Sequence, residues 1–317
     1  MNQMRVSASI GVPPLEPAAA FWYDGKLRTR GEIHVDPMTH ALHYGTGVFE
    51  GIRSFDTPHG VAIFRLREHI ERLFRSAETY GLRLAYDVET IVQATLDTLR
   101  ASGLRISYLR PLVFFGEETF NLNPRALAKT HVMIAALPFN GLHSETARKG
   151  LRVTVSRRFE KTPSRALPSS AKGCGPYANS VLALHEAVER GFDEVLLLND
   201  RGDIAEGSGE NVFVVKDGRL RTNDLDADIL LGITRATVIE LAAELGIDCA
   251  IGPLAEYVVL DADEVFVTGT AAGIVPVAAL DDITYATQRP VTARLTEAYD
   301  RVTLAQAPEH ADWVAFV

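Results

Sequence analysis

Apolar residues recur at intervals of three and four residues in four stretches of the chain, which is the spacing of a helix that buries one face. The stretches are 65–80, 88–99, 177–190 and 234–245. Asp87 precedes the second stretch with a side chain that can cap a helix, and Gly246 follows the last, where glycine commonly ends one. The pattern therefore predicts four helices.

Short apolar runs bounded by turn residues predict strands at 106–115, 131–137, 151–155 and 264–267. Asp-Gly pairs predict β-hairpins at 21–27 and 212–220, and a further turn is expected at 199–202. The predicted strands and helices lack the regular alternation of a parallel sheet, and neither GxGxxG nor a P-loop motif occurs. We expect an α+β fold rather than a doubly wound, nucleotide-binding sheet.

The length of 317 residues suggests two domains or one large unit. A polar stretch after Pro138 separates two predicted strands. We place the domain boundary there, with a small N-terminal domain at 1–139, a linker at 140–149 and a larger C-terminal domain at 150–317.

Acidic residues outnumber basic ones by 41 to 32, and the formal charge of −9 has the wrong sign for a nucleic-acid-binding protein. No apolar run approaches the roughly 20 residues that cross a bilayer, and residues 1–10 lack the apolar core of a secretory signal. The two cysteines form neither a disulfide framework nor a metal-binding pair, and His40 and His43 lack a third ligand. We expect a cytoplasmic protein with no metal, nucleic-acid or membrane partner.

Lysine is scarce, with six among 32 basic residues, and one of the six lies in an unusual setting. Lys172 is flanked by small residues, in Ser169-Ser170-Ala171-Lys172-Gly173, which would let a bulky group approach its amine. A lysine amine becomes a nucleophile or a base only when burial or a nearby cation lowers its pKa. A solvated loop lysine is the alternative at this point.

Three glycine-containing segments could bind charged groups. Segment 206–211 combines glycines with carboxylates that could meet a cationic ring nitrogen, although it could also be a bulged strand end. Segment 231–234 opens a predicted helix, so free N–H groups and the Thr234 hydroxyl could bind an anion, although threonine is also an ordinary helix cap. Segment 269–273 offers similar groups in a loop. Two anion sites without a P-loop suggest a phosphorylated cofactor and an anionic substrate.

Three more polar side chains have open roles. Arg72 could simply pair with Glu68 one helical turn earlier. Tyr108 and Arg110 alternate within a predicted strand and so point to one face, where they could converge on a carboxylate or simply face water.

Eight short motifs follow one another along the chain. They are His40-Ala41-Leu42-His43-Tyr44-Gly45, Val48-Phe49-Glu50-Gly51-Ile52-Arg53, Arg67-Glu68-His69 to Arg72-Leu73, Tyr108-Leu109-Arg110-Pro111, Ala171-Lys172, Glu206-Gly207-Ser208-Gly209-Glu210-Asn211, Leu231-Gly232-Ile233-Thr234-Arg235 and Gly269-Thr270-Ala271-Ala272. In order and spacing they resemble the motifs of the branched-chain amino-acid aminotransferases, which are fold-type IV pyridoxal-phosphate enzymes. The resemblance covers about residues 21–277.

The resemblance implies a two-domain fold similar to that of D-amino-acid aminotransferase, with a small N-terminal α/β domain and a larger C-terminal α/β pseudo-barrel domain. Pyridoxal 5′-phosphate (PLP) would lie between them. By position, Lys172 would form a Schiff base with PLP, Glu206 would pair with the pyridine nitrogen, and Tyr177 would hydrogen-bond the ring oxygen. Leu230 would pack on the ring, and the phosphate would be held by Arg72, Ile233, Thr234 and Thr270.

The resemblance also implies a substrate pocket. Its members would be Tyr44, Phe49, Tyr108, Arg110, Leu122, Thr270 and Ala271, with the Thr270–Ala271 backbone and the Tyr108 hydroxyl holding the α-carboxylate. The chain departs from the family pattern at 120–124, where many members carry a Met-Gly-Val type of loop, at 139–142, which lacks a tyrosine, and at Gly273, which replaces a glutamate. These departures concern specificity and leave the cofactor residues intact.

The implied activity is ping-pong transamination of leucine, isoleucine and valine with 2-oxoglutarate, giving 2-oxo acids and L-glutamate, by a homodimer or a larger assembly of dimers. Lys172 would act as general base on the Cα proton, and Glu206 would keep the ring nitrogen protonated. A role in branched-chain amino acid biosynthesis follows from the same resemblance. The alternatives are a D-amino-acid or (R)-amine transaminase, an aminodeoxychorismate lyase and a non-catalytic PLP-binding homologue.

Overall fold

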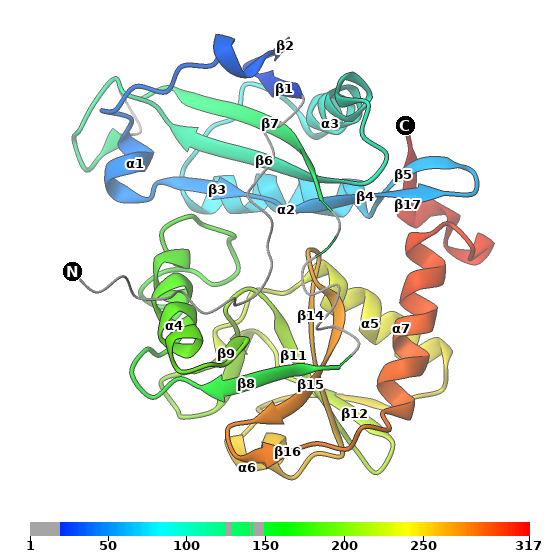
Figure 1. Ribbon diagram of the computed structural model, residues 1–317. Coiled ribbons are helices and arrows are strands. Elements are labelled where there is room, and N and C mark those ends of the chain that lie inside the picture. Colours follow the sequence, from blue (N-terminus) through cyan, green and yellow to red (C-terminus); the bar gives the residue numbers. More distant parts are fainter. Residues whose placement is uncertain (1–19, 125–127, 140, 142–148) are drawn as a thin grey trace, which may run out of the picture.

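The computed structural model describes residues 20–124, 128–139, 141 and 149–317, which form two sheets (Figure 1). The N-terminal sheet is antiparallel throughout. Its sheet order is β17 (Val314–Phe316), β5 (Gly60–Phe64), β4 (Ile52–Thr57), β6 (Ser107–Phe115), β7 (Thr130–Pro138), β1 (Ala20–Tyr23) and β2 (Lys26–Arg28), and β3 (Gly47–Phe49) pairs with β6.

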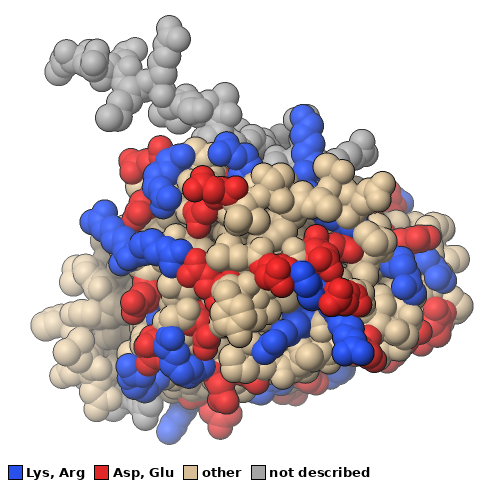
Figure 2. All heavy atoms as spheres, turned by 90° about the horizontal axis from the view of Figure 1, so that it is seen from below, with Lys and Arg blue, Asp and Glu red and all other residues tan. Residues whose placement is uncertain are grey.

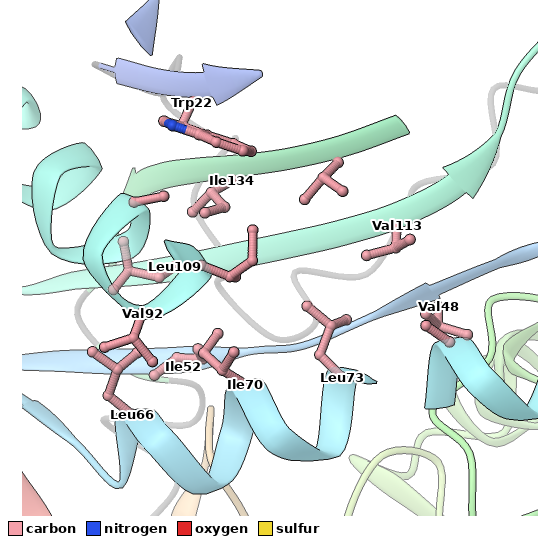
Figure 3. Packing of buried hydrophobic residues seen from close by; sticks show 14 of the residues in the cluster. Trp22, Val48, Ile52, Leu66, Ile70, Leu73, Val92, Leu109, Val113 and Ile134 are labelled. Atoms are coloured by element: carbon pink, nitrogen blue, oxygen red, sulfur yellow. The ribbon is translucent and has the colours of Figure 1, made fainter. Parts of the chain in front are cut away.

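Two helices, α2 (Leu66–Thr79) and α3 (Val88–Ser102), cover one face of this sheet (Figure 3). Ile70 and Leu73 of α2 and Val92 of α3 pack against Leu109 and Ile134 of the strands. Asp87 caps α3, as predicted, by accepting a hydrogen bond of 2.8 Å from the Thr90 backbone N–H. The short helix α1 (His40–Tyr44) precedes β3.

The C-terminal sheet mixes parallel and antiparallel pairs. Its order is β10 (Ile204–Gly207), β9 (Glu194–Leu198), β8 (Leu151–Val155), β15 (Gly273–Leu280), β14 (Glu264–Gly269), β11 (Asn211–Lys216), β12 (Arg219–Thr222) and β13 (Cys249–Ile251), and β16 (Ile283–Thr284) pairs with β15. The parallel pairs are β8 with β9, β8 with β15 and β12 with β13. The prediction of an α+β fold is confirmed.

Four helices accompany the C-terminal sheet. Helices α5 (Ile233–Glu244) and α7 (Pro290–Thr303) share one apolar cluster with β11 and β14, and α4 (Tyr177–Glu189) packs on β9. The other face of the sheet buries a second cluster that includes Ile204 of β10 and Val212 of β11, together with Val259 of α6 (Glu256–Leu260). Strands far apart in the sheet order therefore share one interior, as in a curled sheet.

The last strand crosses between the two halves. Helix α7 runs along the C-terminal half, after which β17 pairs with β5 of the N-terminal sheet (Figure 1). Phe64 of β5 lies in the apolar cluster of α5 and α7, beside Trp313 with ring centroids 6.2 Å apart. One strand of the predicted C-terminal domain thus belongs to the other sheet, while most of the predicted linker, 140 and 142–148, lies outside the described residues.

Local predictions hold well. Both Asp-Gly hairpins are confirmed, with Tyr23 opposite Lys26 and Lys216 opposite Arg219, and the four predicted helices correspond to α2 to α5. In the part of the chain that is described, no helix has the length and apolar character needed to span a bilayer. Basic and acidic side chains are interspersed on the face in Figure 2. Residues 1–10, where we looked for an export signal, lie outside the described part.

Candidate active site

A pocket at the junction of the two halves collects the predicted cofactor residues. Arg72 reaches it from α2, and the other lining residues come from the C-terminal half. All eight predicted cofactor residues line it: Arg72, Lys172, Tyr177, Glu206, Leu230, Ile233, Thr234 and Thr270. These positions span about 200 residues of sequence, so the pocket depends on the whole fold.

Lys172 projects its amine into this pocket from the loop before α4. The Nζ atom donates a hydrogen bond of 2.6 Å to the Tyr177 hydroxyl and lies 5.1 Å from the centre of the Phe49 ring. Burial, assisted by the positive charge of Arg72, lowers the pKa of the Lys172 amine to about 8. The solvated-loop alternative is therefore wrong, and Lys172 has the environment that a nucleophilic amine requires.

Glu206, at the end of β10, is buried and holds its carboxylate in a polar cage. One oxygen is paired with the ammonium of Lys161, and the other accepts hydrogen bonds from the Leu230 backbone N–H at 3.1 Å and from Asn211 Nδ2 at 3.3 Å. Burial opposes a charge on Lys161, but the neighbouring Glu206 outweighs it and raises the pKa of Lys161 above its ordinary value. The segment 206–211 is thus part of a charged site and more than a strand end.

Helix α5 begins at the pocket. Gly232 is its N-cap and has extended backbone, so Thr234 lies in the first helical turn and the alternative of Thr234 as the cap is wrong. The first-turn N–H groups of α5 point toward the pocket, as they do at helix ends that bind anions. A Cβ atom at Gly232 would lie 2.2 Å from Asn211 Oδ1, so only glycine fits this approach. The beginning of α5 and the cage around Glu206 therefore share Asn211.

Arg72 does not pair with Glu68, which is 3.3 Å from Arg65 instead. Its guanidinium holds Glu50 with two hydrogen bonds, from Nε at 2.6 Å and from Nη2 at 2.9 Å, and Nη1 donates to the Leu231 carbonyl at 3.0 Å. The simple helix pair that the sequence allowed for Arg72 is therefore wrong.

Three predicted substrate residues lie next to Lys172. The Arg110 guanidinium stacks 4.7 Å from the centre of the Phe49 ring and lies 3.4 Å from the Tyr108 hydroxyl. Tyr108 also packs against Phe139, with ring centroids 5.1 Å apart. A Cβ atom at Gly51 would overlap the Tyr108 hydroxyl at 1.7 Å, so glycine is required there. The two strand side chains converge on one face, as the alternation predicted.

Two other predicted substrate residues lie elsewhere in the single chain. Tyr44, 45% exposed, donates a hydrogen bond of 3.2 Å to the Phe120 carbonyl, and Leu122 is 80% exposed. Neither lines the pocket that contains Lys172, whereas Thr270 does, and Ala271 follows it. Of the departures from the family pattern, residues 140 and 142 lie outside the described part.

Sequence reasoning missed several buried charges around the pocket. Lys161 was one of six scarce lysines, eleven residues before Lys172, but nothing local marked it as buried. Glu194 accepts hydrogen bonds from the Ser208 backbone and hydroxyl, at 3.0 and 2.9 Å. Burial, together with the charge of Glu194, raises the pKa of the pocket-lining Glu210 to about 8, so that this acid keeps its proton at neutral pH. An acid beside glycines in 206–211 was the only available signal.

The geometry agrees with what comparison with known proteins gives. The family model for class IV amino-transferases matches residues 47–280, and the chain belongs to this family. Among curated relatives, the branched-chain-amino-acid aminotransferase of Pseudomonas aeruginosa is 41% identical over 299 residues, covering 93% of this chain and 96% of the relative. The Escherichia coli protein of the same name is 38% identical, covering 92% and 96%.

A solved structure is equally similar. A branched-chain amino acid aminotransferase from the organism abbreviated T.th., complexed with N-(5′-phosphopyridoxyl)-L-glutamate, superposes with a TM-score of 0.90 at 38% identity and covers 94% of this chain and 98% of that one. The expected fold-type IV architecture is thereby confirmed.

Proposed function

We propose that this chain is a PLP-dependent aminotransferase that transfers the amino group of branched-chain L-amino acids to 2-oxoglutarate. The observation that carries the proposal is the convergence of eight predicted cofactor residues on one pocket that contains a buried lysine. The names of the relatives supply the substrate class, and the phosphopyridoxyl-glutamate complex of the solved relative supports both the cofactor and the glutamate half of the exchange.

The donor groups of the pocket fit PLP. Three N–H groups of Arg72 are used, and an arginine has five, so one on each Nη atom has no partner among the described residues. The Thr268 hydroxyl lines the pocket, is buried and likewise has no partner there. With the beginning of α5, these unpaired donors suit a phosphate.

Each residue then has a definite task. PLP, when bound, supplies an electron sink for the carbanion formed at the substrate Cα. Lys172 attaches the coenzyme through Nζ and, once released, takes the Cα proton as a general base, for which a pKa near 8 is suitable. Glu206 accepts the proton-bearing ring nitrogen, while Tyr177 orients the Lys172 amine through their hydrogen bond. Arg72, Ile233, Thr234 and Thr270 hold the phosphate, and Leu230 contacts the ring.

The substrate side is also a proposal. Phe49, Tyr108 and Arg110 form the wall next to Lys172, and the Thr270–Ala271 backbone holds the α-carboxylate. Tyr44 and Leu122 are exposed in the single chain, which supports a homodimer in which they complete the pocket of the second copy. A cytoplasmic location and a role in branched-chain amino acid biosynthesis rest on the two unpaired cysteines and on the substrate class.

The test is a donor panel with 2-oxoglutarate, followed by coenzyme absorbance and glutamate formation. L-Leucine, L-isoleucine and L-valine are expected to react at least tenfold faster than D-alanine or an (R)-amine. Faster reaction with D-alanine would contradict the proposed substrate class, and pyruvate release from aminodeoxychorismate would contradict transamination. Lys172→Ala is expected to lose nearly all turnover, and wild-type rates in this variant would remove Lys172 from the mechanism.

A further inference from the structure

A completely buried carboxylate stands behind the phosphate side of the pocket. Glu50 follows β3 and has an exposed fraction of 0%. Its two oxygens meet Arg72 Nε and Nη2 at 2.6 and 2.9 Å, His69 Nδ1 at 2.7 Å and the Gly51 backbone N–H at 3.3 Å. Both side-chain partners come from α2, so Glu50 fixes that helix face to the β3–β4 connection.

The charges in this cluster have a clear balance. Burial opposes a charge on Glu50, but Arg72 and His69 outweigh it and hold the pKa of Glu50 below its usual range. Burial lowers the pKa of His69, so the imidazole is neutral at pH 7 and donates its Nδ1–H to the carboxylate. Glu50 and Arg72 therefore form a neutral, doubly hydrogen-bonded ion pair.

The pair also determines where Arg72 can point. Its side-on edge, Nε and Nη2, is occupied by Glu50, and Nη1 is held by the Leu231 carbonyl, one residue before the N-cap of α5. Rotation of the guanidinium would break three hydrogen bonds in a buried site, each costly to leave unmade. The remaining N–H groups, one on each Nη atom, are the only ones that Arg72 can offer to a ligand in the pocket.

We propose that Glu50 is a positioning residue for the coenzyme phosphate, acting through Arg72. It holds the guanidinium with two N–H groups free toward the pocket and neutralises its charge, so that Arg72 contributes directed hydrogen bonds rather than a mobile cation. The inference rests on the proposed role of Arg72 in holding phosphate. His69 completes the arrangement by satisfying the second oxygen of Glu50.

A double-mutant cycle on PLP affinity tests this positioning role, because two residues that act as a unit give non-additive losses. The PLP dissociation constant is measured by titrating the apoenzymes of wild type, Glu50→Gln, Arg72→Met and the double variant. Glu50→Gln is expected to weaken PLP binding at least tenfold, and to add less than twofold in the Arg72→Met background. Glu68→Gln, on the same helix but half-exposed and paired with Arg65, is the matched control and is expected to bind PLP like wild type.

The outcomes separate the two proposals. Unchanged PLP affinity in Arg72→Met would overturn the phosphate role of Arg72. If Arg72→Met weakens binding but Glu50→Gln does not, or if the two losses add fully, the Glu50 inference alone is overturned. If a single variant does not fold, the double variant, which removes both charges, is compared with wild type and must lose affinity for the inference to stand.

A second readout reports charge. The Lys172 amine feels Arg72, Glu50, Tyr108 and Arg110, and Arg72 and Glu50 act on it in opposite directions. Loss of the Glu50 charge leaves Arg72 unopposed, so the pH midpoint of the coenzyme absorbance change in the Glu50→Gln holoenzyme is expected to fall. A midpoint equal to that of wild type would contradict the neutral-pair account.

Discussion

At the scale of the residue, the chemistry depends on a lysine that is expensive to bury. Lys172 has its amine beside Tyr177 and within reach of the charge of Arg72, and its pKa falls from 10.5 to about 8. Each unit of such a shift corresponds to about 1.4 kcal/mol of unfavourable interaction with the charged form. The folded apoenzyme therefore carries a cost that a neutral side chain would remove.

This cost has a definite pH dependence. Below about pH 8 the lysine is protonated in both the folded and the unfolded chain, and the full penalty applies. Between about pH 8 and 10.5 only the unfolded chain keeps the proton, so stability rises with pH. Lys172→Met is thus expected to raise the unfolding temperature of the apoenzyme at pH 7, and by less at pH 9.5, in thermal unfolding followed by circular dichroism.

The control is Lys216→Met, which changes an exposed lysine and is not expected to show this pH-dependent gain. An equal gain for Lys172→Met at both pH values, or a loss at pH 7, would contradict the burial account.

Residue types in the motifs predicted the cofactor set because each type is required by the chemistry of the site. The same reasoning could not predict the partners of those residues. Arg72 looked like a helix partner of Glu68, whereas the fold pairs it with Glu50, 22 residues earlier. Lys161 looked like any surface lysine, whereas the fold pairs it with Glu206, 45 residues later. Long-range ion pairs leave no spacing signal in one sequence.

At the scale of the element, local interactions were sufficient for prediction. The Asp-Gly hairpins formed because Asp24 and Gly25, like Asp217 and Gly218, adopt the positive φ angles of a tight turn. Helices α2 and α3 followed their apolar periodicity. The beginning of α5 was predicted less well, because its cap is Gly232, and the reason for a glycine there is Asn211 from another strand.

Gly232→Ala tests this element. The new methyl group would lie 2.2 Å from Asn211 Oδ1, so either Asn211 or the first turn of α5 must move. Because both border the pocket, PLP affinity is expected to fall at least tenfold, measured by titration of the apoenzyme. Gly252→Ala is the matched control, since a Cβ atom there meets nothing within 4 Å and its backbone bond to Thr222 is kept. Wild-type affinity in Gly232→Ala would show that the tight approach is not needed.

At the scale of the whole molecule, two sheets are joined by contacts that the sequence did not reveal. Strand β17 pairs with β5, more than 240 residues away, and the Arg65 guanidinium lies 3.7 Å from the centre of the Trp313 ring. Arg65 also pairs with Glu240 of α5 at 2.9 Å. A division of the chain at residue 150 misses this return, because a three-residue strand is too short to be predicted from pattern.

Removal of residues 314–317 tests the return strand. The deletion removes the pairing with β5 and leaves its backbone groups without partners, so the temperature of unfolding is expected to fall by several degrees, at about 2–4 °C per kcal/mol. Phe316→Ala keeps the backbone pairing and removes a half-exposed ring, and is expected to unfold near the wild-type temperature. A truncated protein with the wild-type midpoint would make β17 dispensable for stability.

The most direct test of the central claim is the site at which the coenzyme is attached. Borohydride reduction of the PLP-loaded protein fixes an imine as a stable secondary amine, and peptide mass spectrometry then locates it. The account predicts a phosphopyridoxyl group on Lys172 and none on Lys161, the other buried lysine of the pocket. A label on Lys161, or no labelled lysine at all, would contradict it.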